Sequence, residues 1–406
     1  MFQDLNDSSR ESLSTSLGLS SEEELYQLLD AASASKTTEE QLLLYMEYKI
    51  HKFLLLYIPP LLLIIGTIGN VLSFCVLIRK AMRRTSTYNY LAVLSFTDML
   101  VLYIGLLRLW VGELTEDVRD MSDWSCKFIT MAGYTVSVYS VWLLIAVTVE
   151  RYIVTVHSLR ASTMCTQGRA VKTIVCILIL LLSINLHFLW TTQIQTTTRN
   201  GEIIQRCNGA SGYEHLIKQV WPWVDACLYC ILPFIIICIL NCLIVQKVII
   251  SRKSRHLLAG SRLSSSSSNS PRSSNESSAR VTIMLLTISF TFLICTLPMN
   301  VTMIHQAYRG FNALSLQEEA SYRLARTISE LLMYTNHSIN FYLYLLTGNK
   351  FRQQLLTMLC PCNRTLTNVN YSVVTQDVNR TTKVNMDTEM TVIRNGNYSQ
   401  ISDDTD

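Results

Sequence analysis

Four polar side chains lie inside long apolar stretches of this 406-residue chain, and their oxygen atoms could bind a small hard cation. They are Asp98, in the segment LAVLSFTDML, and Ser140, Asn336 and Asn340. A carboxylate, hydroxyl or amide in such a stretch is costly, so each one is a functional candidate. Oxygen atoms of these groups are the ligands that hard cations prefer.

Acid–base catalysis is disfavoured by the same polar groups. Asp98 has no second acid at its level, and His187 has no obvious nucleophile beside it. Enzyme active sites need such groups in pairs or triads. We therefore expect no enzymatic activity, and no cofactor apart from the cation considered above.

The apolar stretches predict the architecture. Hydrophobic residues make up 49% of the chain and charged residues only 16%, where a soluble domain has about 25% charged residues. About 20 apolar residues cross a bilayer, and in lipid a run of this kind must be a helix. We predict an all-α fold, a seven-transmembrane helix bundle with a short amphipathic eighth helix. The predicted spans are 52–79, 87–112, 124–152, 170–193, 219–249, 280–306 and 322–347.

The segments between the spans predict the orientation. Lys and Arg are more frequent after the first, third and fifth spans than after the second, fourth and sixth. Basic segments stay in the cytoplasm, so the N-terminus is expected outside and the C-terminus inside. A formal net charge of +4, dispersed along the chain, gives no reason to expect nucleic-acid binding.

Four regions follow from these spans. Residues 1–50 form an extracellular acidic N-terminal tail, 51–348 the seven-transmembrane domain, 349–362 the amphipathic helix 8, and 363–406 a disordered cytoplasmic tail. The Ser-rich segment 260–279 is expected to be a flexible cytoplasmic loop. The acidic tail is either a solvated linker or an attractor for a basic ligand, and Asn6 begins a sequon on the outer side, where it can carry a glycan.

Several short motifs occur in a fixed order on these spans. They are Asn70 in GNV, Asp98, Glu150-Arg151-Tyr152, Pro233, Phe292 and Pro298 around FLICTLP, and Asn340-Phe341-Tyr342-Leu343-Tyr344. In this order, over residues 50–360, the chain resembles the rhodopsin-like (class A) G-protein-coupled receptors. The segment 338–344, followed by Lys350-Phe351-Arg352, resembles neuropeptide receptors of the FMRFamide and thyrotropin-releasing-hormone type.

The resemblance implies roles for the polar core. Asp98, Ser140, Asn336 and Asn340 would converge near the middle of the bilayer and hold a sodium ion. A hydrogen-bonded polar cluster without an ion is the alternative, and the sequence leaves both open.

The resemblance also implies an activation switch at the inner end of the bundle. Arg151 would pair with Glu150, leave it on activation and meet the G protein; the alternative is an arginine that snorkels at a helix end. Thr296 stands where the family usually has Trp, which predicts an altered trigger. The residues assigned to the switch are Glu150, Arg151, Tyr152, Phe292, Pro298 and Tyr344.

A ligand is expected in the outer half of the bundle. Arg108 lies ten residues outward of Asp98, and Glu330 ten residues outward of Asn340, about 15 Å in each case. These two charges therefore lie at one level and are expected to pair, either as a structural bridge or as part of a site for a polar, peptide-sized ligand. The candidate ligand-binding residues are Arg108, Tyr134, Asp225, His305, Gln306, Arg326, Glu330 and Tyr334.

Two ligand classes are disfavoured by the resemblance. Gly133 occupies the position where amine receptors have an anchoring Asp, and Tyr334 the position where opsins have the Lys that holds retinal. Neither amine binding nor light sensing is therefore expected.

Cysteines predict two modifications. Cys126 and Cys207 face the oxidising side, which favours a disulfide over two free thiols. Cys360 and Cys362 follow the amphipathic segment 350–359, where palmitoylation would anchor an eighth helix to the membrane; an unmodified tail is the alternative.

The function implied by the resemblance is that of a plasma-membrane receptor. It would bind an extracellular ligand, a neuropeptide, and activate a heterotrimeric G protein. Arrestin, a receptor kinase and membrane lipid are further expected partners. Two alternatives stay open: an orphan or constitutively active receptor-like protein with a non-peptide ligand, and a transporter. Transporters usually show paired repeats with broken helices, a pattern that these spans do not share.

Overall fold

The computed structural model describes residues 38–83, 85–199, 202–260, 272–309 and 315–359. The predictions for Asn6, Cys360, Cys362 and the tail 363–406 lie outside these residues. The chain divides into two compact units, Met1–Thr347 and Gly348–Asp406, and each is described by itself.

The first half of the larger unit is helical, and a π-helical turn interrupts its second long helix. Its elements are α3 Thr38–Leu42, α4 Met46–Leu77, α5 Ser86–Val101, the π-turn η1 Leu102–Leu107, α6 Arg108–Leu114, the short 3-10 turn η2 Val118–Asp120, α7 Asp123–Val156, α8 Ser158–Met164, α9 Gln167–Asn185 and α10 Phe188–Thr191.

The second half begins with a β-hairpin and continues as three long helices. Its elements are β1 Thr192–Arg199, β2 Glu202–Gly209, the π-turn η3 Leu216–Val220, α11 Trp221–Asp225, the π-turn η4 Ala226–Ile231, α12 Leu232–Gly260, α13 Arg272–Arg309 and α14 Leu316–Thr347. The smaller unit contains the helix α15 Asn349–Leu359, in the segment predicted to be amphipathic.

Six helical stretches of the described chain are long and apolar enough to cross a membrane. They are Met46–Leu77, Ser86–Leu114, Asp123–Val156, Gln167–Thr191, Leu216–Ser251 and Ile283–Gln306. The seventh predicted span, 322–347, lies in α14, whose outer half carries Arg323, Arg326 and Glu330. These charges lower its apolarity. Nevertheless α14 packs along both α4 and α13, so the helix is part of the same bundle.

Two predicted boundaries are wrong. Residues 38–50, assigned to the N-terminal tail, contain α3 and the start of α4, and Leu42 and Tyr48 pack in one small core with Ala320 of α14. The Ser-rich loop 260–279 is also shorter than expected, because α13 already begins at Arg272. In both places tertiary packing or helix continuation extends structure into segments that read as polar linkers.

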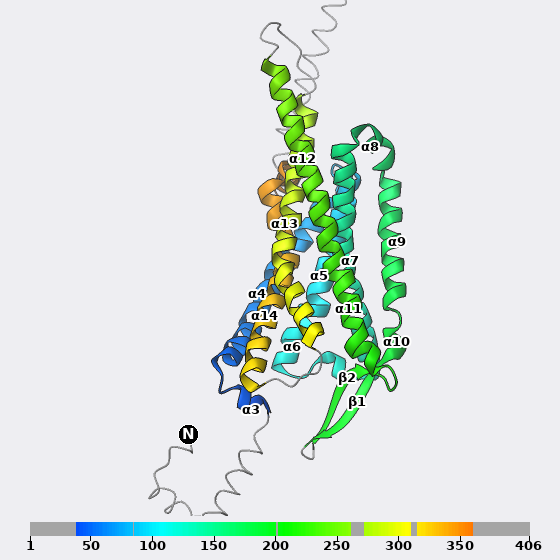
Figure 1. Ribbon diagram of the computed structural model, residues 1–406. Helices are drawn as coiled ribbons and strands as arrows, with labels where there is room; N and C mark the ends of the chain where they lie inside the picture. The colour runs from blue at the N-terminus through cyan, green and yellow to red at the C-terminus, as the bar shows by residue number, and fades with distance from the viewer. Residues whose placement is uncertain (1–37, 84, 200–201, 261–271, 310–314, 360–406) are drawn as a thin grey trace, which may run out of the picture. The chain divides into compact units, whose positions relative to one another are not determined.

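The hairpin was not predicted. β1 and β2 pair antiparallel from Thr192↔Gly209 to Arg199↔Glu202. Figure 1 places the hairpin, α3 and α6 at one end of the larger unit, and α8 at the opposite end. The two strands have the sequences TQIQTTTR and EIIQRCNG. Segments this short do not distinguish a strand from a helix by their pattern of polar and apolar residues.

Close packing between α4 and α14 depends on glycine. A Cβ atom at Gly66 would lie 2.4 Å from Leu102 Cδ1 and 2.9 Å from Ser338 Oγ. One turn further along α4, Asn70 Nδ2 donates a hydrogen bond of 2.9 Å to the carbonyl oxygen of His337. Small residues at such a contact allow two membrane helices to approach closely.

Replacing Gly66 should therefore separate the two helices. We expect Gly66→Val to cost about 1–3 kcal/mol through overpacking and to lower the unfolding temperature of the purified protein. Gly168→Val is the matched control, because a Cβ at Gly168 has nothing within 4 Å. Equal unfolding temperatures for the two variants would contradict this account of the contact.

Candidate functional site

A cavity of about 290 Å³ is lined by residues of α7, α13 and α14, among others. It brings together most of the residues predicted to bind a ligand. Those that line it are Arg108, Tyr134, Asp225, Arg326, Glu330 and Tyr334. Sequence reasoning missed several others, namely Arg119, Tyr229, Met299, Met303 and Met333. Methionines at helical spacing resemble ordinary core residues, so nothing in the sequence marked them.

His305 and Gln306 are not among the residues that line this cavity. Tyr322 Oη donates a hydrogen bond of 2.8 Å to Gln306 Oε1, and the His305 ring lies 6.2 Å from the Tyr322 ring. Both residues are exposed. They follow Met303 by less than one helical turn, and this rotation about the axis of α13 directs them to α14 instead of the cavity.

The positive side of the cavity is a pair of arginines that share one carboxylate. Arg108 Nη1 lies 2.6 Å from Asp117 Oδ2, and Arg119 Nη2 lies 2.8 Å from the same oxygen. Burial raises the pKa of Asp117, but hydrogen bonds from Arg119 and the charges of both arginines outweigh burial, so the pKa lies below its ordinary value. Asp117 is therefore ionised at neutral pH, and the trio keeps one positive charge in excess.

The expected pair between Arg108 and Glu330 is wrong. Glu330 Oε1 instead accepts a hydrogen bond of 2.9 Å from Arg326 Nε, four residues earlier in α14. Arg108 and Glu330 each pair with a residue that is closer in sequence, Asp117 and Arg326 respectively. Asp117 was overlooked because it lies in the connection after α6, where residue spacing does not fix direction.

Asp225 is the negative group that has no such partner. Its carboxylate lines the cavity, yet it makes no hydrogen bond or ion pair with the residues that the structure describes. It ends the short helix α11, which lies between the π-turns η3 and η4. π-turns alter the face that a helix presents and are frequent at functional sites; η1 precedes Arg108 in the same way.

Aromatic rings form the wall between these charges and α10. The ring of Tyr134 stacks on Phe188 at 4.8 Å, with an interplanar angle of 10°. Trp221 meets Tyr134 edge-on at 5.8 Å. Such contacts fix the tyrosine in the cavity wall and leave little freedom for its ring.

A second cavity has a volume of about 640 Å³, and Arg108 lines both cavities. Its walls are mainly polar and come from the end of α6, the connection to α7 and strand β2. They include Glu113, Glu116, Asp117, Asp120 and Arg206. The volumes of the two cavities are of the order found for ligand-binding sites.

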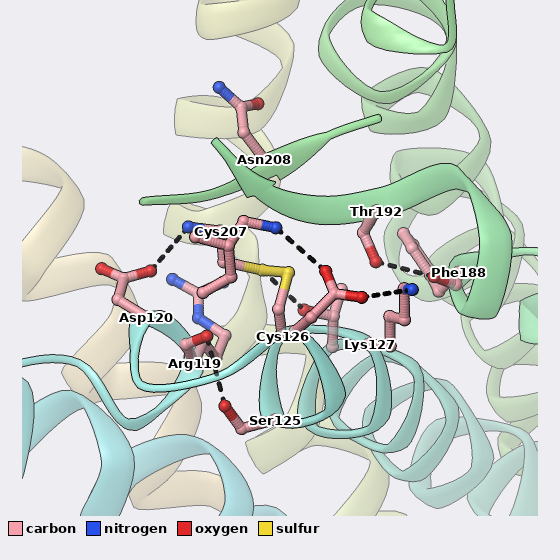
Figure 2. Close-up of a disulfide and its surroundings, with 12 residues drawn as sticks. Arg119, Asp120, Ser125, Cys126, Lys127, Phe188, Thr192, Cys207 and Asn208 are labelled. Atoms are coloured by element: carbon pink, nitrogen blue, oxygen red, sulfur yellow. Dashed lines mark hydrogen bonds and ion pairs between the residues drawn. A yellow bond between two sulfur atoms is a disulfide. The ribbon is translucent and has the colours of Figure 1, made fainter. Parts of the chain in front are cut away.

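A disulfide holds the hairpin beside the N-terminal end of α7, as predicted. Cys126 in α7 and Cys207 in β2 are bonded, with Cα atoms 5.4 Å apart. Asp120 Oδ1 accepts a hydrogen bond of 2.7 Å from the backbone N–H of Cys207 (Figure 2). The disulfide and the Asp120 carboxylate therefore fix strand β2, and two residues of this strand, Gln205 and Arg206, line the second cavity.

Glu150 and Arg151, near the end of α7 that leads into α8, are both buried, but they do not pair with each other. Glu150 Oε1 accepts hydrogen bonds from Ser86 Oγ at 2.7 Å and Thr87 Oγ1 at 2.5 Å. The guanidinium of Arg151 donates to the same Thr87 hydroxyl. The expected local pair is therefore wrong, because adjacent helical residues point in different directions and meet through a residue of α5.

The other residues assigned to the switch are placed as follows. Phe292 and Tyr344 are buried, and Pro298 lies inside α13. The Tyr152 ring lies edge-on to His157 at 5.8 Å. Thr296, at the position that usually carries Trp, donates its hydroxyl to the carbonyl of Phe292 at 2.7 Å. This hydroxyl serves its own helix and cannot act as a large rotating ring.

The polar core is centred on Asp98. Its Oδ1 accepts a hydrogen bond of 2.7 Å from Ser140 Oγ and lies 2.8 Å from His337 Nδ1, and its Oδ2 accepts a hydrogen bond of 2.7 Å from Asn340 Nδ2. Three of the four predicted residues thus meet. Asn336 lines a small cavity beside Ser140 and Asn340. His337 was missed, although it stands between two residues that were chosen.

Comparison with known proteins gives a consistent result. Residues 69–344 match the family described as 7 transmembrane receptor (rhodopsin family). The chain is 26% identical over 306 residues to the FMRFamide receptor of Drosophila melanogaster, a match that covers 72% of this chain and 51% of that protein.

Two further relatives are matched over more of their own length. The growth hormone secretagogue receptor type 1 of Oryctolagus cuniculus is 26% identical over 306 residues, covering 73% of this chain and 78% of that receptor. Neuromedin-U receptor 2 of Mus musculus is 26% identical over 312 residues, covering 74% of each chain. This chain thus spans about half of the FMRFamide receptor and about three quarters of the other two.

The shared role of Thr87 can be tested by removing its hydroxyl. Thr87→Ala leaves Glu150 with one donor fewer and takes from Arg151 its contact with α5, so we expect a loss of about 1–3 kcal/mol in stability. The measurement is the unfolding temperature of the purified protein. Thr115→Ala is the control, because its exposed hydroxyl bonds only to the backbone of Val111. If Thr87→Ala were as stable as this control, the network would be unimportant.

Proposed function

This chain belongs to the rhodopsin family of seven-transmembrane receptors, and we propose that it binds an extracellular neuropeptide and activates a heterotrimeric G protein. Family membership makes the chain a multi-pass membrane receptor and not an enzyme. The relatives include receptors named for FMRFamide and neuromedin-U, which supports a peptide as the ligand here.

The observation that carries this proposal is the polarity and extent of the outer cavities. A cavity of about 290 Å³ has five charged side chains in its wall, and Arg108 is also part of the wall of a second cavity of about 640 Å³. A peptide offers carbonyl groups, N–H groups and charges along an extended chain, which suits such a surface. Gly133 and Tyr334 both line the first cavity, of about 290 Å³. An amine receptor would need Asp at the first of these positions, and an opsin would need Lys at the second.

The charges in the first cavity indicate which groups the peptide carries. Asp225 has no ionic partner in the described chain, so we propose that it receives a basic group, such as an arginine side chain. Arg108 and Arg119 share a single carboxylate and can also donate to carbonyl or amide oxygens. A short peptide with a basic residue and an amidated end meets both requirements.

Orientation follows from the two ends of the bundle. We propose that the end with the hairpin and the Cys126–Cys207 disulfide faces outward at the plasma membrane, since disulfides form in oxidising compartments. The end with α8 and Arg151 would then face the cytoplasm, where the basic connecting segments belong. The N-terminus would be extracellular and the C-terminus cytoplasmic.

Further partners and modifications are proposed on the sequence. Arrestin and a receptor kinase would act at the cytoplasmic end, and lipid would surround the spans. A glycan on Asn6 and palmitate on Cys360 or Cys362 are consistent with that orientation. The helix α15 directly precedes these cysteines in the chain.

The ligand proposal is tested by a library of short amidated peptides on cells that express the full chain, read by calcium and cAMP together. We expect active peptides to contain a basic residue. Asp225→Asn should lower their potency about 10–100-fold, because a charged hydrogen bond is lost.

The control for this test is on the peptide side. An analogue with a neutral isostere of the basic residue should be equally weak on wild type and Asp225→Asn. If no peptide gave a response although the receptor was present at the cell surface, the proposal of a peptide ligand would fail. If peptides activated the receptor and had the same potency on Asp225→Asn as on wild type, only the proposed role of Asp225 would be wrong.

G-protein activation is tested at Arg151. We expect Arg151→Ala to retain peptide binding but to lower agonist-stimulated nucleotide exchange at least ~10-fold, since a buried hydrogen-bonded charge is removed. Arg160→Ala, an exposed arginine of α8, is the control and should signal normally. Normal exchange by Arg151→Ala would show that this residue does not couple the receptor to its G protein.

A further inference from the structure

We propose that His337 takes the place of a sodium ion beside Asp98, so that the polar core of this receptor is held by protein donors alone and does not respond to sodium. The resemblance to the family implied a sodium site at Asp98, Ser140, Asn336 and Asn340. The residues present do not fit that ion. This proposal concerns the bundle core and does not rest on the peptide ligand.

The carboxylate of Asp98 already has its partners. Ser140 Oγ and His337 Nδ1 lie 2.7 and 2.8 Å from Oδ1, and Asn340 Nδ2 lies 2.7 Å from Oδ2. An ionised carboxylate only accepts hydrogen bonds, so Nδ1 of His337 carries its proton and points at Asp98. Each of these donors directs a positive hydrogen to the place where a cation would need to bind.

The imidazole also takes up the space. Asp98 is 0% exposed and His337 is 1% exposed. A cavity lined by Ser140, Asn336 and Asn340 has a volume of about 10 Å³, and Asp98 is not among its lining residues. Such a volume holds about one water molecule, whereas a hard cation needs several oxygen ligands around it.

Two polar atoms at this cluster have no partner within the described residues, namely Asn340 Oδ1 and His337 Nε2. They do not make a cation site. Both atoms carry free lone pairs, but two atoms are fewer than the several oxygen ligands that a hard cation needs, and one of the two is a nitrogen. Since Asn340 borders the small cavity, one water there is the occupant that suits its oxygen.

His337 is fixed from a second side, which makes the replacement a stable one. Its carbonyl oxygen accepts the hydrogen bond from Asn70 Nδ2 of α4, while its ring meets Asp98 of α5. Ser140 of α7 and Asn340 of α14 complete the cluster. One histidine therefore links helices that an ion would otherwise hold together through its ligands.

The test compares the unfolding temperature of the purified full-length receptor in sodium chloride and in choline chloride at equal ionic strength. We expect the same value in both salts for wild type. His337→Ser should open the site and gain roughly 2–4 °C in sodium, and the double variant His337→Ser with Asp98→Asn should lose that gain. His187→Ser is the matched control outside the core and should ignore sodium.

Two outcomes would overturn the proposal. One is a wild-type receptor that sodium stabilises over choline; the other is a His337→Ser variant that folds and remains indifferent to sodium. If His337→Ser does not fold, the line width of ²³Na in the presence of wild type decides. It should equal the width seen with Asp98→Asn, and a broader line for wild type would show bound sodium.

Discussion

The larger unit depends on the need to satisfy one buried negative charge. Asp98 has no exposed surface, and an unpaired carboxylate in an apolar bundle would be very costly. Its hydrogen bonds come from α7 and α14, so α5, α7 and α14 must stand at one level relative to each other. This requirement also explains α14, which is not apolar enough to be counted among the six candidate spans but carries the donors that Asp98 needs.

The same need governs the two ends of the bundle, with different donors. At the inner end Glu150 is satisfied by hydroxyls of α5 and not by the neighbouring arginine. At the outer end Asp117 is satisfied by two arginines. Asp225 alone among these acids lacks a donor in the described chain, and its carboxylate lines the first cavity. A receptor needs such an incomplete site where its ligand arrives, and complete ones where its helices must hold.

The sequence was sufficient for features that depend on composition along the chain. Long apolar runs predicted the helices, and the resemblance to a known receptor family implied that Asp98, Ser140 and Asn340 meet. Pairing of charges was predicted poorly, since it depends on rotation about each helix axis and on connections. The π-turns before Arg108 and around α11 change the direction in which the side chains after them point, and no pattern of residues predicted these turns. His337 was passed over because a lone histidine in a span has no distinguishing spacing.

The position of the core residues on α14 gives the outer cavity a direct mechanical route inward. Glu330 and Tyr334 line that cavity, and His337 follows Tyr334 by three residues, about 4.5 Å along the helix. The contact is tight, since a Cβ at Gly105 would lie 2.6 Å from Tyr334 Oη. A group that displaces this tyrosine must therefore move α14 or η1. Moving α14 breaks hydrogen bonds to Asp98 that no mobile ion can relax, and packed elements of this kind change between discrete arrangements instead of deforming gradually. Protein donors at Asp98 thus favour a switch with two distinct states.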